Sequence, residues 1–126
     1  MTTAHITTAH YQVTLTSNSH QFIADEPLTV GGKDTGPAPD NILEAALASC
    51  TAITLRMYAD RKQWPVESID VAVQVQRIDN KTVFTRNITL HGQIDEEQKE
   101  RLLQIAKACP VSKSLMGEIE INSLIV

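Results

Sequence analysis

Apolar and polar positions alternate in two stretches near the start of the chain. The first runs from Tyr11 to Leu15 and the second ends at Phe22, with the turn-forming residues Ser17-Asn18-Ser19 between them. Alternation with a period of two is typical of half-buried strands. The pattern therefore predicts an N-terminal β-hairpin.

A loop and a long helix follow this hairpin. The segment 31–39 contains three Gly and two Pro, which predicts a loop. Pro39 and Asp40 suit the first turn of a helix, because proline lacks an N–H that would have no partner there and a carboxylate accepts bonds from free backbone amides. We predict a helix from Asn41 to Gln63, stopped by Pro65. Its first half is apolar on nearly every face, which predicts burial on all sides.

The register of a second hairpin follows from its alternating apolar residues. Four lie before a predicted Asp79-Asn80 turn and three lie after it: Ile69, Val71, Val73 and Val75, then Phe84, Ile88 and Leu90. If Ile78 pairs with Lys81, then Val75 lies opposite Phe84, Val73 opposite Arg86, Val71 opposite Ile88 and Ile69 opposite Leu90. Both apolar sets then share one face, and Arg86 is a cation on that face.

The last part of the chain predicts two short helices and a strand. Asp95-Glu96-Glu97 places acidic residues at the start of a helix whose apolar stripe reaches Cys109, where Pro110 ends it. A helical turn from Ser112 to Leu115 and a strand from Ile119 to Val126 complete the prediction.

Composition limits the classes of function. The length of 126 residues, with 42% apolar and 21% charged residues, predicts a single globular domain over residues 1–126. The net charge is -4 and Lys and Arg do not cluster, so we expect no nucleic-acid partner. The start of the chain has no signal-peptide pattern, and the uncharged run Ala45–Leu55 is too short to span a bilayer. We therefore expect a cytoplasmic protein without a membrane partner.

Two cysteines, Cys50 and Cys109, are the first candidates for chemistry. They are too few for a disulfide scaffold and have no zinc-ligand spacing. Cys50 lies on an apolar helix, where a cysteine is either a small packed side chain or a nucleophile. Cys109 precedes Pro110, where the free N–H groups of a following helix would favour a thiolate. Sequence spacing leaves open whether the two sulfurs meet.

The other polar candidates each have a structural and a functional interpretation. Asp40 either satisfies backbone amides at the helix start or takes part in the site. Arg86 either extends its guanidinium to the sheet edge or meets an anion, for which the Cys50 thiolate and the Asp40 carboxylate are the candidates. None of the four histidines has metal-ligand spacing: His5, His10, His20 and His91. The first two lie in an N-terminal segment that we expect to be frayed. We expect no metal and no bound cofactor.

Several motifs together resemble the OsmC/Ohr family of bacterial thiol peroxidases. They occur in the family's order over nearly the whole chain from about His20: Ala24-Asp25-Glu26-Pro27, Gly31-Gly32, Gly36-Pro37-Ala38-Pro39, Leu43-Glu44-Ala45-Ala46-Leu47-Ala48-Ser49-Cys50-Thr51, Tyr58-Ala59-Asp60-Arg61-Lys62 and Ala108-Cys109-Pro110-Val111. Two cysteine motifs with a matching helix between them are more specific than either cysteine alone.

The resemblance implies a fold and a mechanism. The fold would be α+β, an intertwined homodimer in which antiparallel sheets wrap around a long central helix. The cysteine of the central helix, here Cys50, would attack a hydroperoxide and become a sulfenic acid, and Cys109 would resolve it as a disulfide. A dithiol, such as a lipoyl-type group, would be the reductant. Two other functions stay open: a non-catalytic dimer that binds a small hydrophobic ligand, and a redox sensor.

One feature of the Ohr branch is missing from the sequence. That branch uses an arginine near the N-terminus and a carboxylate ten residues before the first cysteine to hold the thiolate. Asp40 stands at the carboxylate position, one methylene shorter than the usual Glu, but no basic residue precedes Lys33. Arg86 is the candidate substitute.

Overall fold

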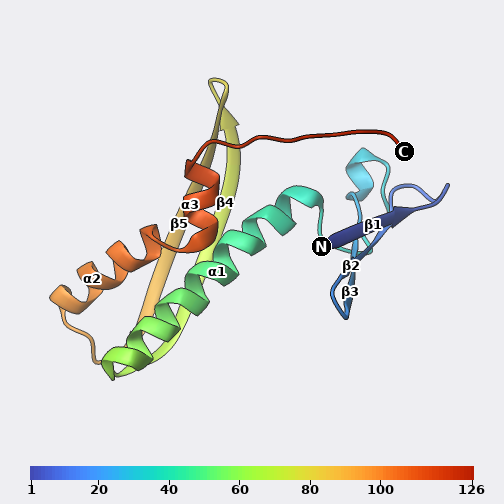
Figure 1. Cartoon of the computed structure of the whole chain (residues 1–126). Coiled ribbons are helices and arrows are strands. Elements are labelled where there is room, and N and C mark those ends of the chain that lie inside the picture. Colours follow the sequence, from blue (N-terminus) through green and yellow to red (C-terminus); the bar gives the residue numbers. More distant parts are fainter. The chain divides into compact units, whose positions relative to one another are not determined.

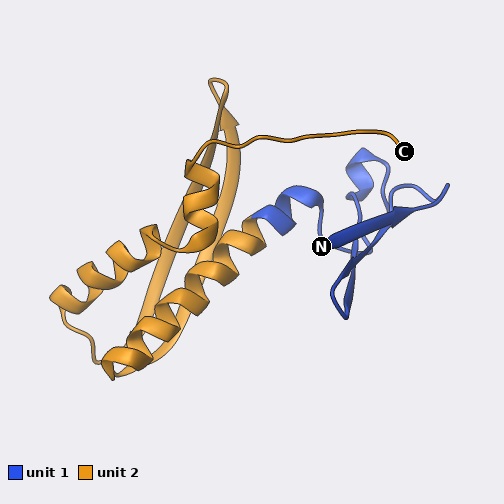
Figure 2. Ribbon diagram, in the orientation of Figure 1, with its two compact units in different colours: residues 1–43 blue, residues 44–126 orange.

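The chain forms two compact units in a computed structural model that describes all of residues 1–126. The units comprise residues 1–43 and 44–126, and the boundary falls within the long helix α1 (Figure 2). The first unit contains three strands and a short 3-10 helix, and the second contains two long strands and two further helices. The fold class is α+β with antiparallel sheets, which confirms the expectation from the family resemblance. That residues 1–126 act as one domain remains a prediction.

The first unit contains the predicted N-terminal hairpin. Strands β2 (Val13–Ser17) and β3 (His20–Ala24) pair antiparallel, and Ser17 lies opposite His20 across the turn. A further strand, β1 (Thr2–Ile6), pairs with β2 on its other side. The expectation of a frayed N-terminus is therefore wrong, because the ladder between β1 and β2 takes up backbone groups of this segment.

A buried carboxylate organises the loop that follows β3. Asp25 is 2% exposed and accepts five bonds: from the backbone N–H of Tyr11, Glu26, Lys33 and Thr35 at 2.8–3.3 Å, and from the Thr35 hydroxyl at 2.7 Å. The Thr35 hydroxyl is the main cause that lowers the pKa of Asp25 from 3.8 to about 2, against the opposing effect of burial. Gly32 fits this loop because a Cβ there would collide with the Glu26 carbonyl. The 3-10 helix η1 (Leu28–Val30) lies within it.

Helix α1 (Pro39–Lys62) begins at the predicted Pro39-Asp40 turn and ends within one residue of the predicted stop. Its buried positions recur every four residues along one stripe: Leu47, Thr51, Leu55 and Ala59. On another face, Ile53 is 59% and Met57 61% exposed. The expectation of burial on all sides is therefore wrong within the second unit, because the elements of that unit cover only one stripe. By length and composition α1 also meets the criterion for a membrane span, which core helices of soluble proteins meet as well.

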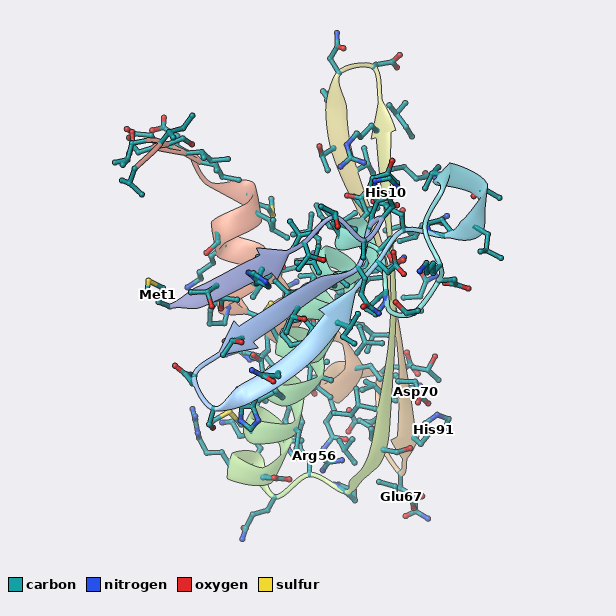
Figure 3. All side chains as sticks on the ribbon, turned by 90° about the vertical axis from the view of Figure 1, so that its right-hand side faces the viewer. Met1, His10, Arg56, Glu67, Asp70 and His91 are labelled. Atoms are coloured by element: carbon teal, nitrogen blue, oxygen red, sulfur yellow. The ribbon has the colours of Figure 1, made fainter.

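Strands β4 (Val66–Ile78) and β5 (Lys81–Gly92) form a two-stranded antiparallel ribbon. Every predicted pair is present, from Ile78 opposite Lys81 to Ile69 opposite Leu90. Asp79 and Asn80 form the turn with φ of 49° and 62°, the left-handed region expected of a two-residue hairpin turn. One face carries the half-buried apolar residues. The other carries polar groups such as Asp70 and His91, whose side chains meet at 2.7 Å (Figure 3).

Helices α2 (Glu96–Lys107) and α3 (Pro110–Met116) follow the ribbon (Figure 1). Asp95 caps α2 through a reciprocal pair of bonds with Gln98, which accounts for its start at the predicted position. The core of the second unit combines residues of α1, β4 and α2: Leu55, Ala59, Val66, Leu102 and Ala106. Pro110 both ends α2 and occupies the first turn of α3.

The predicted final strand, Ile119–Val126, is wrong. Residues 117–126 have no regular structure, and their apolar side chains are exposed, with Ile121 at 83% and Leu124 at 80%. A strand requires a neighbour that takes up its backbone hydrogen bonds, and this segment pairs with no strand of its own chain. The segment has the alternation of apolar residues that is typical of a strand, but no neighbouring strand is present for it to pair with.

Candidate active site around two cysteines

Three elements of the second unit bring the candidate residues together. Cys50 and Thr51 lie on α1, Arg86 lies on β5, and Cys109 lies between α2 and α3. Thr51 belongs to the buried stripe of α1, and Arg86 belongs to the apolar face of the ribbon, opposite Val73. The site is therefore formed where the helix stripe packs against the ribbon and the chain enters α3.

Cys109 is fully buried, with 0% of its surface exposed. It is the cap residue of α3, and its Sγ accepts a hydrogen bond from the Ser112 N–H at 3.4 Å. This arrangement follows from the sequence, because Pro110 starts the helix and leaves the preceding residue in an extended conformation suited to capping. The expected position of Cys109 at the start of a helix is confirmed.

Arg86 is half-buried and makes three contacts through its Nη1 atom. It donates to Thr51 Oγ1 at 2.8 Å and to Ser112 Oγ at 3.1 Å, and it lies 4.0 Å from Cys109 Sγ. The candidates from sequence were the Cys50 thiolate and the Asp40 carboxylate. The structure gives Arg86 two hydroxyl groups and the other sulfur as partners.

Thr51 connects the helix to both groups. Its hydroxyl donates to the Leu47 carbonyl one turn earlier at 2.7 Å, so its oxygen accepts the bond from Arg86. The same oxygen lies 3.8 Å from Cys109 Sγ. Thr51 is 0% exposed, and its hydroxyl therefore has a fixed set of partners within the protein.

The surroundings of Cys109 affect its ionisation in opposite directions. Burial raises the pKa of Cys109, whereas the Ser112 backbone N–H, the Ser112 hydroxyl and the Thr51 and Cys50 side chains lower it. These groups together outweigh burial, so the pKa of Cys109 lies below its ordinary value of 9.0. The environment thus favours the thiolate of a cysteine that solvent does not reach.

Cys50 differs from Cys109 in its exposure. It is partly exposed, and both cysteines are free thiols. Cys50 is among the groups that lower the pKa of Cys109, and the hydroxyl oxygen of Thr51, the residue after Cys50 on α1, lies 3.8 Å from Cys109 Sγ. The structure therefore places the two thiols in one region of the molecule, with Cys50 partly exposed and Cys109 buried.

Asp40 lies in the other unit, residues 1–43, where it forms the first turn of α1. That position agrees with its interpretation as a residue of the helix start. A role for Asp40 at the cysteines remains a prediction.

Two residues of the site, Thr51 and Ser112, were not candidates in the sequence. Each is a common neutral residue, and neither belongs to a motif whose spacing indicates chemistry. The available signal was proximity along the chain, since Thr51 follows Cys50 and Ser112 lies one helical turn after Cys109. Their importance arises from the contact with Arg86, which is distant from both in sequence.

Comparisons with known proteins identify a family and several similar structures. The profile of the OsmC family, described as OsmC-like protein, matches residues 32–123. An OsmC-like protein of Mycoplasma pneumoniae is similar in structure, with a TM-score of 0.79 and 22% identity over 93% of this chain and 86% of that chain. No match to a curated protein was found.

Organic hydroperoxide resistance proteins are also among the similar structures. OhrB of Bacillus subtilis has a TM-score of 0.62 and 22% identity, covering 93% of this chain and 90% of its own. The corresponding protein of Elizabethkingia anophelis has a TM-score of 0.63 and 23% identity, covering 94% and 89%. These likenesses show a shared fold. With the profile match over most of the chain, they establish that this protein belongs to the OsmC-like family.

Proposed function

We propose that this protein is a thiol-dependent peroxidase that reduces hydroperoxides through Cys50 and Cys109 and so contributes to defence against oxidative stress. The observation that carries the proposal is the pair of free thiols, one partly exposed on α1 and the other buried beside Thr51, the next residue of that helix. The similar structures that are named organic hydroperoxide resistance proteins support hydroperoxides as the substrate class.

Exposure assigns the first step to Cys50. A hydroperoxide must approach the attacking sulfur, and Cys50 is the accessible one of the pair. The Cys50 thiolate attacks the terminal oxygen of the hydroperoxide, a sulfur–oxygen bond forms and the oxygen–oxygen bond breaks. The alkoxide leaves and takes up a proton to become an alcohol. Cys50 is then a sulfenic acid.

The second step uses the buried thiol. Cys109 attacks the sulfur of the Cys50 sulfenic acid, a disulfide forms and hydroxide leaves, which becomes water on protonation. The hydroperoxide supplies the oxidising equivalents of both steps. A dithiol, for which a lipoyl-type group is our candidate, would return the disulfide to two thiols. These steps require only the two cysteines and the dithiol.

We also propose that the active form is a homodimer. Ile53 and Met57 lie on a face of α1 that no element of the second unit covers, one turn apart and well exposed. A second copy of the chain would remove this apolar surface from water. This face is one turn from Cys50 along α1, so a partner would also limit solvent near the sulfurs.

Peroxide consumption and intact mass test the proposal directly. With one equivalent of cumene hydroperoxide and no reductant, we expect the peroxide to be consumed and each chain to lose two hydrogens in mass. Cys50→Ser should abolish consumption, whereas Cys109→Ser should consume peroxide once and stop at an oxygenated Cys50. Ser49→Ala, on the exposed neighbour of Cys50, is the matched control and should behave as the wild-type protein. A wild-type protein that stops at a sulfinic Cys50 would contradict the resolving role of Cys109.

A specific observation keeps ligand binding as a second candidate function. A groove of about 390 Å³ between α1, β5 and α2 is lined mainly by apolar side chains, including Leu55, Ile88 and Leu102, with Lys99 among them. Such a groove suits a small hydrophobic ligand. A wild-type protein that consumes no peroxide under the conditions above but binds an apolar fluorescent probe in this groove would favour a binding protein. A redox sensor would instead form the disulfide but fail to turn over with any dithiol.

A further inference from the structure

The polar groups around the two cysteines are distributed unequally. The Arg86 guanidinium and the Thr51 and Ser112 hydroxyls all surround Cys109, together with the Ser112 backbone N–H. Cys50, the partly exposed cysteine, acts on this cluster through its effect on the pKa of Cys109. The groups that stabilise an anion are therefore placed at the buried thiol.

The position of Arg86 requires a counter-charge. Its guanidinium is half-buried on the apolar face of the ribbon and forms no ion pair with a carboxylate of this chain. A partly buried cation without an anion is unfavourable, because desolvation costs free energy that neutral hydroxyls only partly offset. Among the three groups that Nη1 contacts, two are alcohols that do not ionise at physiological pH. The Cys109 sulfur is the one that becomes an anion.

The two hydroxyls give the guanidinium a defined position. Bonds of 2.8 Å to Thr51 and 3.1 Å to Ser112 hold Nη1 between α1 and α3, within 4.0 Å of the sulfur. Thr51 is itself held by the Leu47 carbonyl. Arg86 is thus a positioned charge, since its orientation depends on residues of two other elements.

We propose that Arg86, held by Thr51 and Ser112, keeps Cys109 as a thiolate that is ready to attack oxidised Cys50, and so sets the rate of disulfide formation. This inference rests on the proposed peroxidase function. It assigns the arginine to the second thiol, whereas the family resemblance places an arginine at the first. Arg86 is then a positioning residue for the resolving step.

The chemistry of the second step explains why a preformed thiolate matters. When the Cys109 thiolate attacks, the sulfur–sulfur bond forms and the sulfur–oxygen bond of Cys50 breaks, and hydroxide leaves to become water. A protonated Cys109 would first have to transfer its proton, but its sulfur has no hydrogen bond to a histidine or carboxylate that could accept it. The ionisable or charged groups facing Cys109 are Arg86 of β5 and Cys50 of α1, and of these only Arg86 is a cation. The fraction of thiolate therefore determines how quickly the sulfenic acid is captured.

The first experiment measures ionisation without any peroxide. In a Cys50→Ser background, the ultraviolet absorbance of the remaining thiolate is followed against pH for the Arg86→Met and Arg86→Lys variants. Arg86→Met keeps the length of the apolar stem and should raise the pKa of Cys109 by at least one unit, which lowers the thiolate fraction about tenfold below that pKa. Arg86→Lys keeps the charge and should recover part of the shift. Arg56→Met, at an exposed arginine of α1 that bonds Asp60 and the Glu67 carbonyl, is the matched control and should not change the curve.

The second experiment separates the two steps in the protein with both cysteines. Rapid mixing with cumene hydroperoxide, followed by quenching and mass spectrometry, gives the rate of peroxide loss and the rate of disulfide formation. Arg86→Met should slow disulfide formation about tenfold or more relative to peroxide loss near neutral pH, and let a sulfenic-acid trap label Cys50.

Two results would overturn the proposal. One is a superimposable titration curve for Cys109 with and without Arg86. The other is a variant in which peroxide loss slows and disulfide formation from the sulfenic acid does not, which would assign Arg86 to Cys50. Failure of the peroxidase function itself is distinguishable from failure of this proposal. The titration of Cys109 needs no peroxide, so it tests the effect of Arg86 even if the wild-type protein consumes no peroxide. Thermal unfolding of each variant identifies any loss of fold, and Arg86→Lys supplies the comparison if Arg86→Met is unstable.

Discussion

The exposed face of α1 supports a quantitative prediction about self-association. Ile53 and Met57 are 59% and 61% exposed on a helix whose opposite stripe is fully packed. We expect the Ile53→Ser, Met57→Ser double variant to weaken the proposed homodimer severely. Both residues are replaced by a small polar side chain, and neither contributes to the buried core, so the fold of each chain should persist.

The expected magnitude follows from the exposed fractions. Complete burial of an Ile or Met side chain is worth about 1.5–3 kcal/mol, so burial of the exposed part of each contributes about 1–2 kcal/mol. A symmetric dimer contains each residue twice, which gives about 4–8 kcal/mol for the four side chains. At about 1.4 kcal/mol per tenfold change in Kd, the variant should bind its partner more weakly by a factor of at least several hundred, on the order of 700.

Sedimentation velocity over a range of protein concentrations measures this change. The wild-type protein should be a dimer at micromolar concentration, and the double variant should be largely monomeric. Leu103→Ser, at a 42% exposed position of α2, removes a similar apolar side chain from another helix and should leave the dimer intact. The reasoning would be refuted by a monomeric wild-type protein, or by a double variant whose Kd is unchanged.

Three further predictions concern stability. Leu55→Ala should lower the free energy of unfolding by about 2–5 kcal/mol in urea titrations, because Leu55 is fully buried in the core between α1, β4 and α2; a loss below 1 kcal/mol would contradict that packing. The Asp25 carboxyl group binds its proton less readily in the folded state than in the unfolded state. Its contribution to the free energy of unfolding is therefore present above pH 3.8 and is lost as the pH falls towards about 2. The urea midpoint of Asp25→Asn should depend less on pH over this window than that of the wild-type protein, and parallel curves would argue against this role. Asp95→Ala should cost about 1 kcal/mol through loss of the α2 cap, measured by thermal unfolding, whereas an unchanged midpoint would show that the bonds with Gln98 are replaced by water.

The β4–β5 hairpin was predictable in detail because local rules determine it. Alternation specifies which side chains share a face, and a two-residue turn at Asp79-Asn80 specifies which residues pair. The same two rules placed Arg86 on the apolar face. Helix boundaries were predictable for a similar reason, since Pro39, Asp95 and Pro110 act on the backbone next to them.

Features that depend on distant partners were not predictable from the sequence. The stretch Ile119–Val126 has the alternation of a strand, but a strand also needs a neighbour, which a pattern does not specify. The composition of α1 showed that the helix is apolar, but it did not show which of its faces would be buried against other elements of the chain. The partner of Arg86 was missed because Cys109 approaches it through the packing of α3, which the sequence does not encode as a spacing.

The hairpin register also links the tip of the ribbon to the chemistry near its middle. Arg86 lies on the same strand face as Ile88 and Leu90, whose pairing with Val71 and Ile69 keeps that face against the helices. Lengthening or shortening the ribbon by one residue on each strand at the tip would preserve these pairs. Insertion or deletion of a single residue at the tip could instead shift the pairing of the two strands by one residue. The side chains of β5 would then point to the opposite face from their present partners on β4, and the Arg86 guanidinium would move away from the cysteines. The length of an exposed turn therefore constrains the redox chemistry of cysteines it never touches, and insertions there should be tolerated in pairs and harmful one at a time.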